Sequence, residues 1–415
     1  QELWASRDSR LGALDYFRVA AMTWVMANHL GSEGRIDVLE RRESAAGYKE
    51  AIHGNVLLGP LFGNSALGVE VFLVLGMILG IGSSSKLQGS MALQRRTMHY
   101  ISKRSIRLWL TSAAFILIVL SPHFRSILPR FSGTMTTACG WKGLLAHLSF
   151  TGNLQVVPTC LGYLWYLGLD FQLQLFVPYL ANLLTGSPGQ RKAGFFVVLA
   201  GVVGSMILRG LWCIAHGTCN KSDVDIPFIH IASLTEREME GMYDGLWRKY
   251  ALPPFKVGPF LLAAILGVKV HDGEEISLRK SRALFWSGLA GSIAVVYGIL
   301  PEYWYPLMPA NAYNVTYTAS FRTAFSFCVL SMISSFVLLP TPRPVWKWAS
   351  FLARICFSAY LVHMPAAYVF NWWPAFQETE SALFLLVIVL PLHIVLTFSI
   401  AYVFYLTIEG PLARL

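Results

Sequence analysis

Residues 14–30 read LDYFRVAAMTWVMANHL, an apolar stretch long enough to predict a membrane-spanning helix. The stretch carries three ionisable residues, Asp15, Arg18 and His29. Ionisable side chains are costly in a membrane helix and usually face the interior of a bundle or a water-filled cavity. The stretch therefore predicts a first span that also forms one wall of a polar site.

The spacing of these three residues places them on one face of the helix. Arg18 and His29 are eleven residues apart, which is about three turns and about 16 Å along the helix axis. Asp15 lies one turn before Arg18, nearly on the same line. This face predicts a site for an extended ligand, with an anionic part beside Arg18 and a reacting group beside His29. The structural alternative is that His29 only bonds a neighbouring helix and Arg18 only neutralises Asp15.

The composition assigns the chain to one broad class. Of its 415 residues, 55% are hydrophobic and only 13% are charged, which is too apolar for an ordinary soluble protein. The apolar residues form long runs, which predict an all-α, polytopic membrane bundle with a single domain over 1–415. The formal charge of +10 does not indicate nucleic acid, because the basic residues lie mostly in short loops where they orient the helices.

We expect about ten membrane-spanning helices. Their predicted ranges are 14–30, 65–82, 106–121, 162–184, 194–212, 256–270, 284–300, 321–340, 351–370 and 382–408. Pro60 and Gly63 predict a broken half-helix before the second span. Asn64 and Ser65 are a predicted cap for the main segment of that span.

The loops predict the orientation of the bundle. The loop between the second and third spans contains basic residues and no acid, namely Lys86, Arg95, Arg96, Lys103, Arg104 and Arg107. The positive-inside rule makes this side cytoplasmic, and an even number of spans places both termini there.

The opposite side carries the signs of the secretory pathway. Two glycosylation sequons, at Asn220 and Asn314, fall on this predicted outer side. Four of the six cysteines lie there too, and an oxidising compartment would pair them most simply as Cys139–Cys160 and Cys213–Cys219. We therefore expect a protein of the endoplasmic reticulum or plasma membrane, surrounded by membrane lipids.

The cytoplasmic segment SKRSIRL, residues 102–108, contains a pair of arginines. Arg104 and Arg107 are one turn apart and project together. A face with two guanidinium groups suits phosphate, because each can bind an oxyanion in a bidentate way. The alternative is contact with lipid head groups, which basic residues at cytoplasmic helix ends often make.

Two further predicted spans carry acids. Glu70 lies in GVEVFLVLG, and Arg18 or His29 are its expected partners. In LGYLWYLGLDFQLQLFVPYL, Asp170 and Gln174 are four residues apart and share a face. The same segment contains Trp165 and Tyr166, which line the predicted site or, alternatively, belong to the interfacial aromatic belt.

The last candidates lie near the end of the chain or beside the second span. His363 in FSAYLVHMP is a candidate for substrate binding, as are Asp15 and Asn64, although a lone buried histidine more often bonds another helix. Glu409 in TIEGP is expected to pair with a cytoplasmic arginine. We expect no metal, because the candidate ligands lie on four predicted helices without close pairs.

These segments resemble, in order, the blocks of the membrane acyltransferase-3 superfamily, and specifically its animal branch related to nose-resistant-to-fluoxetine proteins. The matching pieces are LDYFRVAAMTWVMANH, NSALGVEVFLVLGMILG, SKRSIRL, CLGYLWYLGLDFQLQLFVPYL, FKVGPFLLAAILGV, FSAYLVH and IEGP, which cover residues 11–411. The chain departs from the family where Ser-Gly commonly follows the second block, because Gly76-Met77 stands there and the acid is Glu70 rather than aspartate.

The resemblance implies an integral membrane O-acyltransferase that takes an acyl group from cytoplasmic acyl-CoA. The acceptor would be a hydroxyl of a lipid, sterol, sugar or peptide in or across the membrane. Arg104 and Arg107 would hold the phosphates of CoA, Arg18 would help to position the donor, and His29 would be the general base. Glu70 or Asp170 would fix the tautomer of His29 or stabilise its charged form.

Two alternatives from other classes stay open. The animal branch is linked to lipid and drug uptake, which favours a transporter of lipids or hydrophobic small molecules that uses the same cavity without catalysis. A scaffold subunit whose polar helix residues only pack is the other. The bulk of Met77 would narrow a tunnel, change the choice of acyl chain, or mark a member that no longer catalyses.

Overall fold

We analysed the chain in a computed structural model. The structure describes residues 10–31, 55–86, 92–137, 139–155, 160–219, 245, 247–300, 311–341, 344–378 and 381–413. All regular elements within these ranges are helices.

The helices follow one another along the chain with few long breaks. The first half contains α1 (Leu14–Gly31), α4 (Leu58–Gly63), η3 (Ser65–Leu67), α5 (Gly68–Ser85), α6 (Leu93–Leu120), α7 (Pro122–Ile127), α8 (Pro129–Met135), α9 (Trp141–Leu148), η5 (Gly162–Leu164), α10 (Trp165–Gln174), α11 (Val177–Leu184) and α12 (Pro188–Ala215). The second half contains α15 (Pro253–His271), α16 (Leu278–Tyr297), α18 (Ala312–Val337), α19 (Lys347–Arg354), α20 (Cys356–Val369), η6 (Phe370–Trp372), α21 (Pro374–Glu378), α22 (Ala382–Phe384), η7 (Leu385–Val389), α23 (Leu390–Phe404), η8 (Tyr405–Glu409) and α24 (Gly410–Leu412).

Local sequence signals explain where several helices begin. Ser187 starts α12 with a capping box, in which its side chain and that of Gln190 satisfy each other's backbone N–H groups and Pro188 occupies the first helical position. The predicted break before the second span is confirmed, because α4 and η3 precede α5. The predicted cap at Asn64 is wrong, since its side chain makes no capping hydrogen bond.

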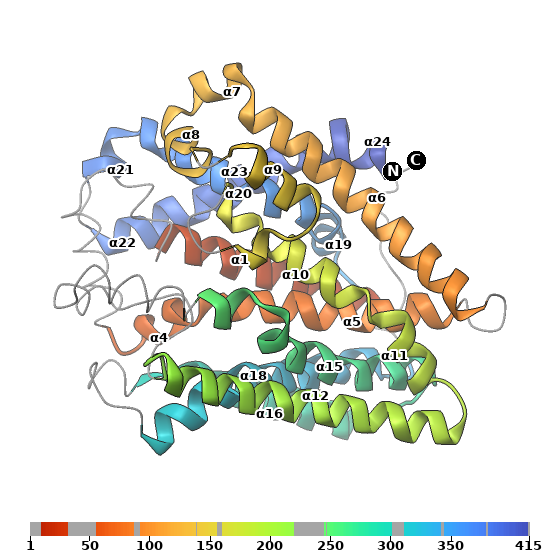
Figure 1. Ribbon diagram of the computed structural model, residues 1–415. Coiled ribbons are helices and arrows are strands. Elements are labelled where there is room, and N and C mark those ends of the chain that lie inside the picture. Colours follow the sequence, from red (N-terminus) through yellow and green to blue (C-terminus); the bar gives the residue numbers. More distant parts are fainter. Residues whose placement is uncertain are drawn as a thin grey trace.

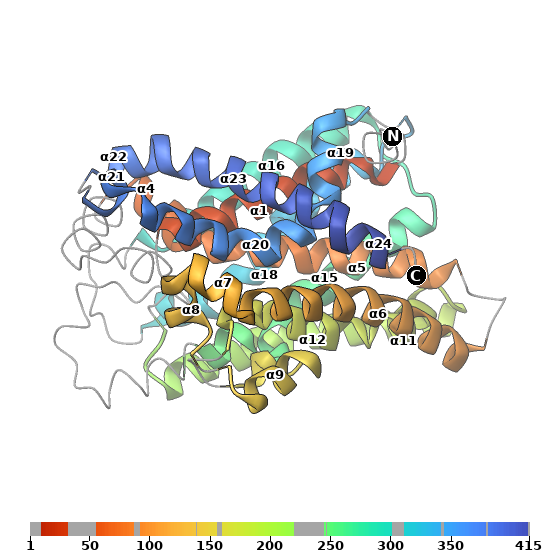
Figure 2. The ribbon, with the colours of Figure 1, turned by 90° about the horizontal axis from the view of Figure 1, so that it is seen from above.

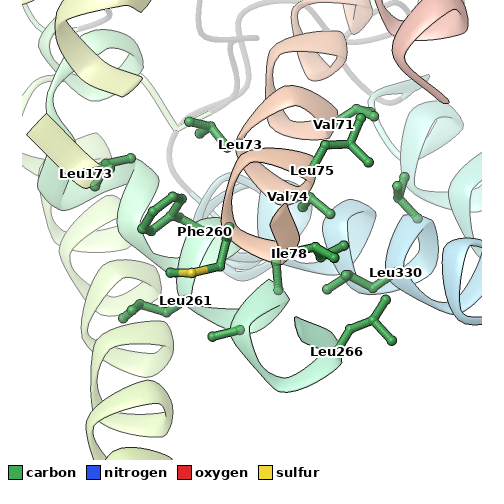
Figure 3. Close-up of a cluster of buried hydrophobic side chains, with 14 of the residues drawn as sticks. Val71, Leu73, Val74, Leu75, Ile78, Leu173, Phe260, Leu261, Leu266 and Leu330 are labelled. Atoms are coloured by element: carbon green, nitrogen blue, oxygen red, sulfur yellow. The ribbon is translucent and has the colours of Figure 1, made fainter. Parts of the chain in front are cut away.

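The helices pack in two groups that meet along α1 and α5 (Figures 1 and 2). On one side, α12, α15, α16 and α18 pack against one another, and α15 and α18 contact α5. The buried side chains of this group surround α5, among them Val74, Ile78 and Phe260 (Figure 3). On the other side, α20 and α23 pack together against α1 and form a second apolar core with α6 and α8.

Each predicted span overlaps helices of the structure, although several helix ends differ from the prediction, and the number of spans stays a prediction. Five described helical segments are long and apolar enough to cross a membrane, and a sixth is the pair α19–α20, which bends by 70°. The segments are Leu58–Ser85, Pro188–Ala215, Trp247–His271, Ala312–Val337 and Leu385–Leu412. The helices α1 and α6 also coincide with predicted spans, but their ionisable residues lower their hydropathy. A multi-pass helical membrane protein is therefore the supported fold.

The two ends of the bundle differ as the sequence predicts. Arg191 at the start of α12 pairs with Asp272 at the end of α15, with 2.8 Å between nitrogen and oxygen. At the opposite end of α12, 28 residues long, Cys213 forms a disulfide with Cys219. Both predicted pairings are confirmed, since Cys139 is bonded to Cys160. Which end faces the cytoplasm stays a prediction.

The predicted glycosylation sites, unlike the predicted disulfides, are not confirmed. The side chain of Asn314 lies in the first turn of α18 and is only 5% exposed. A glycan needs an accessible surface segment, so the structure argues against glycosylation at Asn314. Asn220 lies outside the residues that the structure describes.

Close helix packing depends on Gly288 of α16, and this dependence can be measured. A methyl group added there would lie 2.9 Å from the Met332 side chain and would collide with a backbone oxygen of α18. We expect Gly288→Ala to destabilise the fold by about 1–3 kcal/mol. Gly204→Ala on α12 is the matched control, because a methyl group there meets no atom within 4 Å, and alanine favours the helix by up to about 1 kcal/mol. Thermal unfolding in detergent micelles tests the pair, and equal unfolding temperatures would contradict the packing.

Candidate functional site

The predicted polar face of α1 lies along α20. At one end, Arg18 is 3.5 Å from Asp15, and both lie within electrostatic range of Cys356 on α20. At the other end, the ring of His29 is 5.0 Å from the ring of His363. Cys356 and His363 are two turns apart on one helix, so the prediction that Arg18 and His29 share a face is confirmed.

His363 is held in place by a local break in α20. Pro365 lies inside this helix and has no N–H to donate to the carbonyl of Leu361. The hydroxyl of Tyr163 donates to that carbonyl instead, at 3.0 Å. The ring of Tyr163 in turn packs edge-on against the ring of His363, with centroids 5.4 Å apart. The proline therefore creates the acceptor that anchors a tyrosine beside the imidazole.

A row of aromatic side chains connects His363 to the predicted donor end. Arg104 on α6 bonds Asp170 on α10 at 2.5 Å, and both act electrostatically on Tyr166. The ring of Tyr166 lies 6.0 Å from that of Tyr360, which lies 5.8 Å from the ring of His363. The structure thus connects Arg104, Asp170, Tyr166, His363 and His29 through an ion pair, electrostatic interactions and ring contacts. Phe72, which packs against both apolar cores, borders this row at Tyr166.

Arg104 is one of three residues on α6 that form hydrogen bonds with α10 and α11. Tyr100 donates to Gln174 at 2.5 Å, and Arg96 donates to Asn182 at 2.8 Å. The residues on α6 are four apart, so they share a face. Gln174 is therefore used in joining helices, which differs from the predicted substrate contact.

Gly76 on α5 leaves space for the side chains of Asp170 and Gln174, which form the polar seam between α5 and α10. A methyl group added at Gly76 would lie 2.8 Å from the amide nitrogen of Gln174 and 3.5 Å from a carboxylate oxygen of Asp170. Met77, about 100° further round the helix, is fully buried in the apolar core around α5. The departure from the family pattern therefore leaves the small residue at the seam and places the bulky one in the core.

Arg107, the second predicted phosphate ligand, pairs with Glu409 at 2.7 Å. Glu409 is fully buried and also accepts from the hydroxyl of Ser358 at 2.6 Å. The predicted pairing of Glu409 with an arginine of this segment is confirmed. The Arg107 side chain is 52% exposed, so it remains the more accessible of the two arginines.

Glu70 lies in a different polar cluster from the one predicted. Its carboxylate bonds Lys256 of α15 at 2.5 Å and also bonds Arg322 of α18. All three side chains are at most 1% exposed. The expected pairing of Glu70 with Arg18 or His29 is therefore wrong, because two cations on other helices are closer. Asp170 likewise bonds Arg104 rather than the imidazole of His29.

Sequence reasoning missed these cations because helix edges are hard to place. Lys256 is the first residue of the predicted span 256–270, and Arg322 is the second residue of the predicted span 321–340. The structure starts α15 at Pro253 and α18 at Ala312, so both cations lie deeper in their helices than predicted. The available signal was a lone cation beside each of two apolar runs. Trp165 belongs to the same cluster, since its ring lies 5.9 Å from the amine of Lys256.

Two further buried residues differ from what the sequence predicts. Asn64, a predicted substrate ligand, is buried and donates its amide to the carbonyl of Val296 at 2.8 Å, so it fixes the break before α5. His393 on α23 was not predicted, yet it is fully buried and within electrostatic range of His29. Its signal is a single histidine in an otherwise apolar span.

A small cavity of about 220 Å³ lies between α8 and η6, beside Phe131, Tyr368 and Trp372. A tunnel joining Arg104, Arg18 and His29 stays a prediction. Among the described residues, no group of three or more His, Cys, Asp or Glu side chains is arranged to hold a metal ion.

Comparisons with known proteins define the class. The profile of a family described as an acyltransferase domain matches residues 11–406, so the chain belongs to this acyltransferase-3 family. A similar protein is "Regulator of hypoxia-inducible factor 1" from Caenorhabditis elegans, which is 42% identical over 416 residues, covering 100% of this chain and 82% of the relative. That relative belongs to the animal branch related to nose-resistant-to-fluoxetine proteins, so the resemblance is confirmed. No solved structure matches the chain.

The buried Glu70 cluster gives a stability prediction. Glu70→Gln removes the carboxylate that Lys256 and Arg322 share inside the bundle, and we expect it to cost about 3–5 kcal/mol. Glu274→Gln is the matched control, because Glu274 pairs with Lys269 at the surface with 48% of its side chain exposed, and exposed pairs contribute about 1 kcal/mol or less. Unfolding temperatures in micelles measure the difference. Equal effects of the two substitutions would contradict the assigned role of the cluster.

Proposed function

We propose that this protein transfers an acyl group from acyl-CoA to a hydroxyl of an acceptor, with His29 as the general base. Membership of the acyltransferase-3 family supports the reaction type. The observation that carries the assignment is the environment of His29. Its side chain is half-buried, and within the described part of the chain its ring makes no hydrogen bond, yet it contacts His363. A base needs such an available nitrogen.

The chemical step balances without another reactant. The acceptor oxygen attacks the thioester carbonyl while His29 takes the hydroxyl proton, and the carbon–sulfur bond then breaks. The CoA thiolate leaves and takes the proton back from the imidazolium. His363 and His393 come from α20 and α23 and lie next to this transfer.

The donor is proposed to bind at the arginine end of the site. Arg104 and Arg107 would hold its phosphates, and Arg18 would lie farther along the face of α1. Because Arg104 already bonds Asp170 and Arg107 already bonds Glu409, a phosphate must replace or share these carboxylates. The long pantetheine arm would then follow Tyr166 and Tyr360 toward His29, along the row of contacts described above.

The setting of the reaction is also proposed. The apolar helices support a multi-pass membrane protein, and two disulfides on one end of the bundle support a membrane of the secretory pathway. The acceptor would be a lipid, sterol, sugar or peptide that reaches His29 from the membrane or from the outer side.

A transporter of lipids or hydrophobic small molecules is the second candidate. The observation in its favour is that both proposed phosphate ligands are bonded to carboxylates within the protein. The name of the Caenorhabditis elegans relative also describes regulation rather than a reaction. A transporter would move its substrate without CoA, and Arg104→Ala would change that movement little.

The assignment of the base predicts the effect of His29→Gln. We expect acyl transfer from radiolabelled acyl-CoA to membrane acceptors to fall about 10²- to 10⁴-fold, the usual contribution of a general base. His216→Gln is the control, because His216 is the exposed C-cap residue of α12 and stacks on Trp212 of the same helix. Full activity of the His29 variant, with normal expression and unfolding temperature, would show that the base is assigned wrongly.

The proposed donor site predicts that substitutions of Arg107 and Glu409 change the KM for acyl-CoA in opposite directions. Arg107→Gln should raise the KM for acyl-CoA about tenfold, because a charge-assisted bond to phosphate is lost. Glu409→Gln should lower that KM, because it removes the carboxylate that competes for Arg107. Arg279→Gln is the control, an exposed arginine at the start of α16. If both substitutions raise the KM, the pair is structural and the phosphates bind elsewhere.

A further inference from the structure

Two histidines beside His29 have a ring nitrogen with no partner. His363 and His393 are fully buried, and the Nε2 atom of each has no hydrogen-bond partner among the residues that the structure describes. A buried polar atom without a partner costs about 1–3 kcal/mol. Two such atoms next to one candidate base therefore point to a missing ligand.

The hydrogen bonds fix which kind of ligand group His363 needs. Its Nδ1 lies 2.6 Å from the carbonyl oxygen of Tyr360. A carbonyl oxygen only accepts, so Nδ1 carries the proton. In the neutral ring Nε2 is then a lone-pair acceptor, and it can be satisfied only by a donor such as a hydroxyl group. His393 offers a second ring, whose Nδ1 lies 3.4 Å from the hydroxyl of Thr397.

The three imidazoles come from three helices. His29 is on α1, His363 on α20 and His393 on α23; the rings of His29 and His363 are 5.0 Å apart, and His393 lies within electrostatic range of both. The walls around them are apolar or aromatic, with Phe370 6.2 Å from the ring of His393 and Tyr163 5.4 Å from that of His363. The cluster is therefore a small polar patch inside an apolar wall, which fits the polar end of an amphiphile.

We infer that His363 and His393 form, beside His29, a subsite for an acceptor that carries two neighbouring hydrogen-bond donors. One hydroxyl would give its proton to His29, and the second would donate to the unpartnered Nε2 of His363 or form a hydrogen bond with that of His393. The second hydroxyl keeps its proton, so the subsite orients the acceptor without changing the proton balance of the transfer. This inference rests on the proposed function, since it names the acceptor class of the same site.

Binding of a diol tests the subsite without any acyl donor. We compare the binding of 1,2-octanediol and 1-octanol to the full chain in detergent micelles by isothermal titration calorimetry. The two probes share an eight-carbon chain and differ in one hydroxyl. We expect the diol to bind about tenfold tighter, the size of effect that one buried hydrogen bond gives.

Variants locate the second hydroxyl. His363→Phe and His393→Phe should each reduce the preference for the diol, and the double variant should bring the ratio of affinities to about one. His393→Gln keeps a hydrogen-bonding group and should retain part of the preference. The ratio is the readout because a general loss of stability weakens both probes alike. His216→Phe, at the exposed end of α12, is the control and should keep the preference.

The outcomes separate this inference from the proposed reaction. A wild-type ratio near one, or a tenfold ratio that survives the double variant, overturns the subsite and leaves ordered water as the partner of both nitrogens. His29→Gln with undiminished acyl transfer overturns the proposed base but leaves the diol ratio to stand on its own. A diol preference that depends on His363 and His393 supports the subsite whether or not transfer is detected.

Discussion

Ionisable side chains can stand inside this apolar bundle because partners on other helices hold them, and the packing follows from those pairs. Glu70 joins α5 to α15 and α18 through Lys256 and Arg322. Asp170 joins α10 to α6 through Arg104. Breaking a buried pair costs far more than an exposed one, since a charge is left in an apolar medium. These bonds therefore fix which helices are neighbours, while the apolar side chains fix how closely they approach.

The polar row lies where the two apolar cores meet. Tyr166 packs against the core around α5, and Tyr360 packs against the core around α20. A site at such a boundary is lined by helices from both groups, so a small shift of one group against the other would change the spacing between Arg104 and His29. The position of the site therefore suits a reaction that brings a donor and an acceptor in from different directions.

Sequence reasoning predicted what depends on one segment or on residue type. The shared face of Arg18 and His29 follows from helical periodicity, and the pairing of Cys139 with Cys160 follows from an oxidising compartment and few choices. The partners of Glu70 could not be found in this way, because a carboxylate in one span can meet any cation in the other spans. The error in the helix ends added to this difficulty. Nine residues of α18 precede its predicted start, so Arg322 lies about three turns inside the helix and not at its end. His393 was missed because a lone histidine has no distinguishing pattern until its neighbours in space are known.

The two ends of the site differ in how far their hydrogen bonds are satisfied. At the arginine end, both guanidinium groups have carboxylate partners at 2.5 and 2.7 Å. At the imidazole end, two buried nitrogens have no partner in the described part of the chain. A ligand at the first end must compete with bonds of the protein, whereas a ligand at the second end satisfies groups that would otherwise cost free energy. A hydroxyl compound at the imidazole end would therefore meet a preorganised site, whereas an acyl donor at the arginine end would bind only if bonds of the protein exchange.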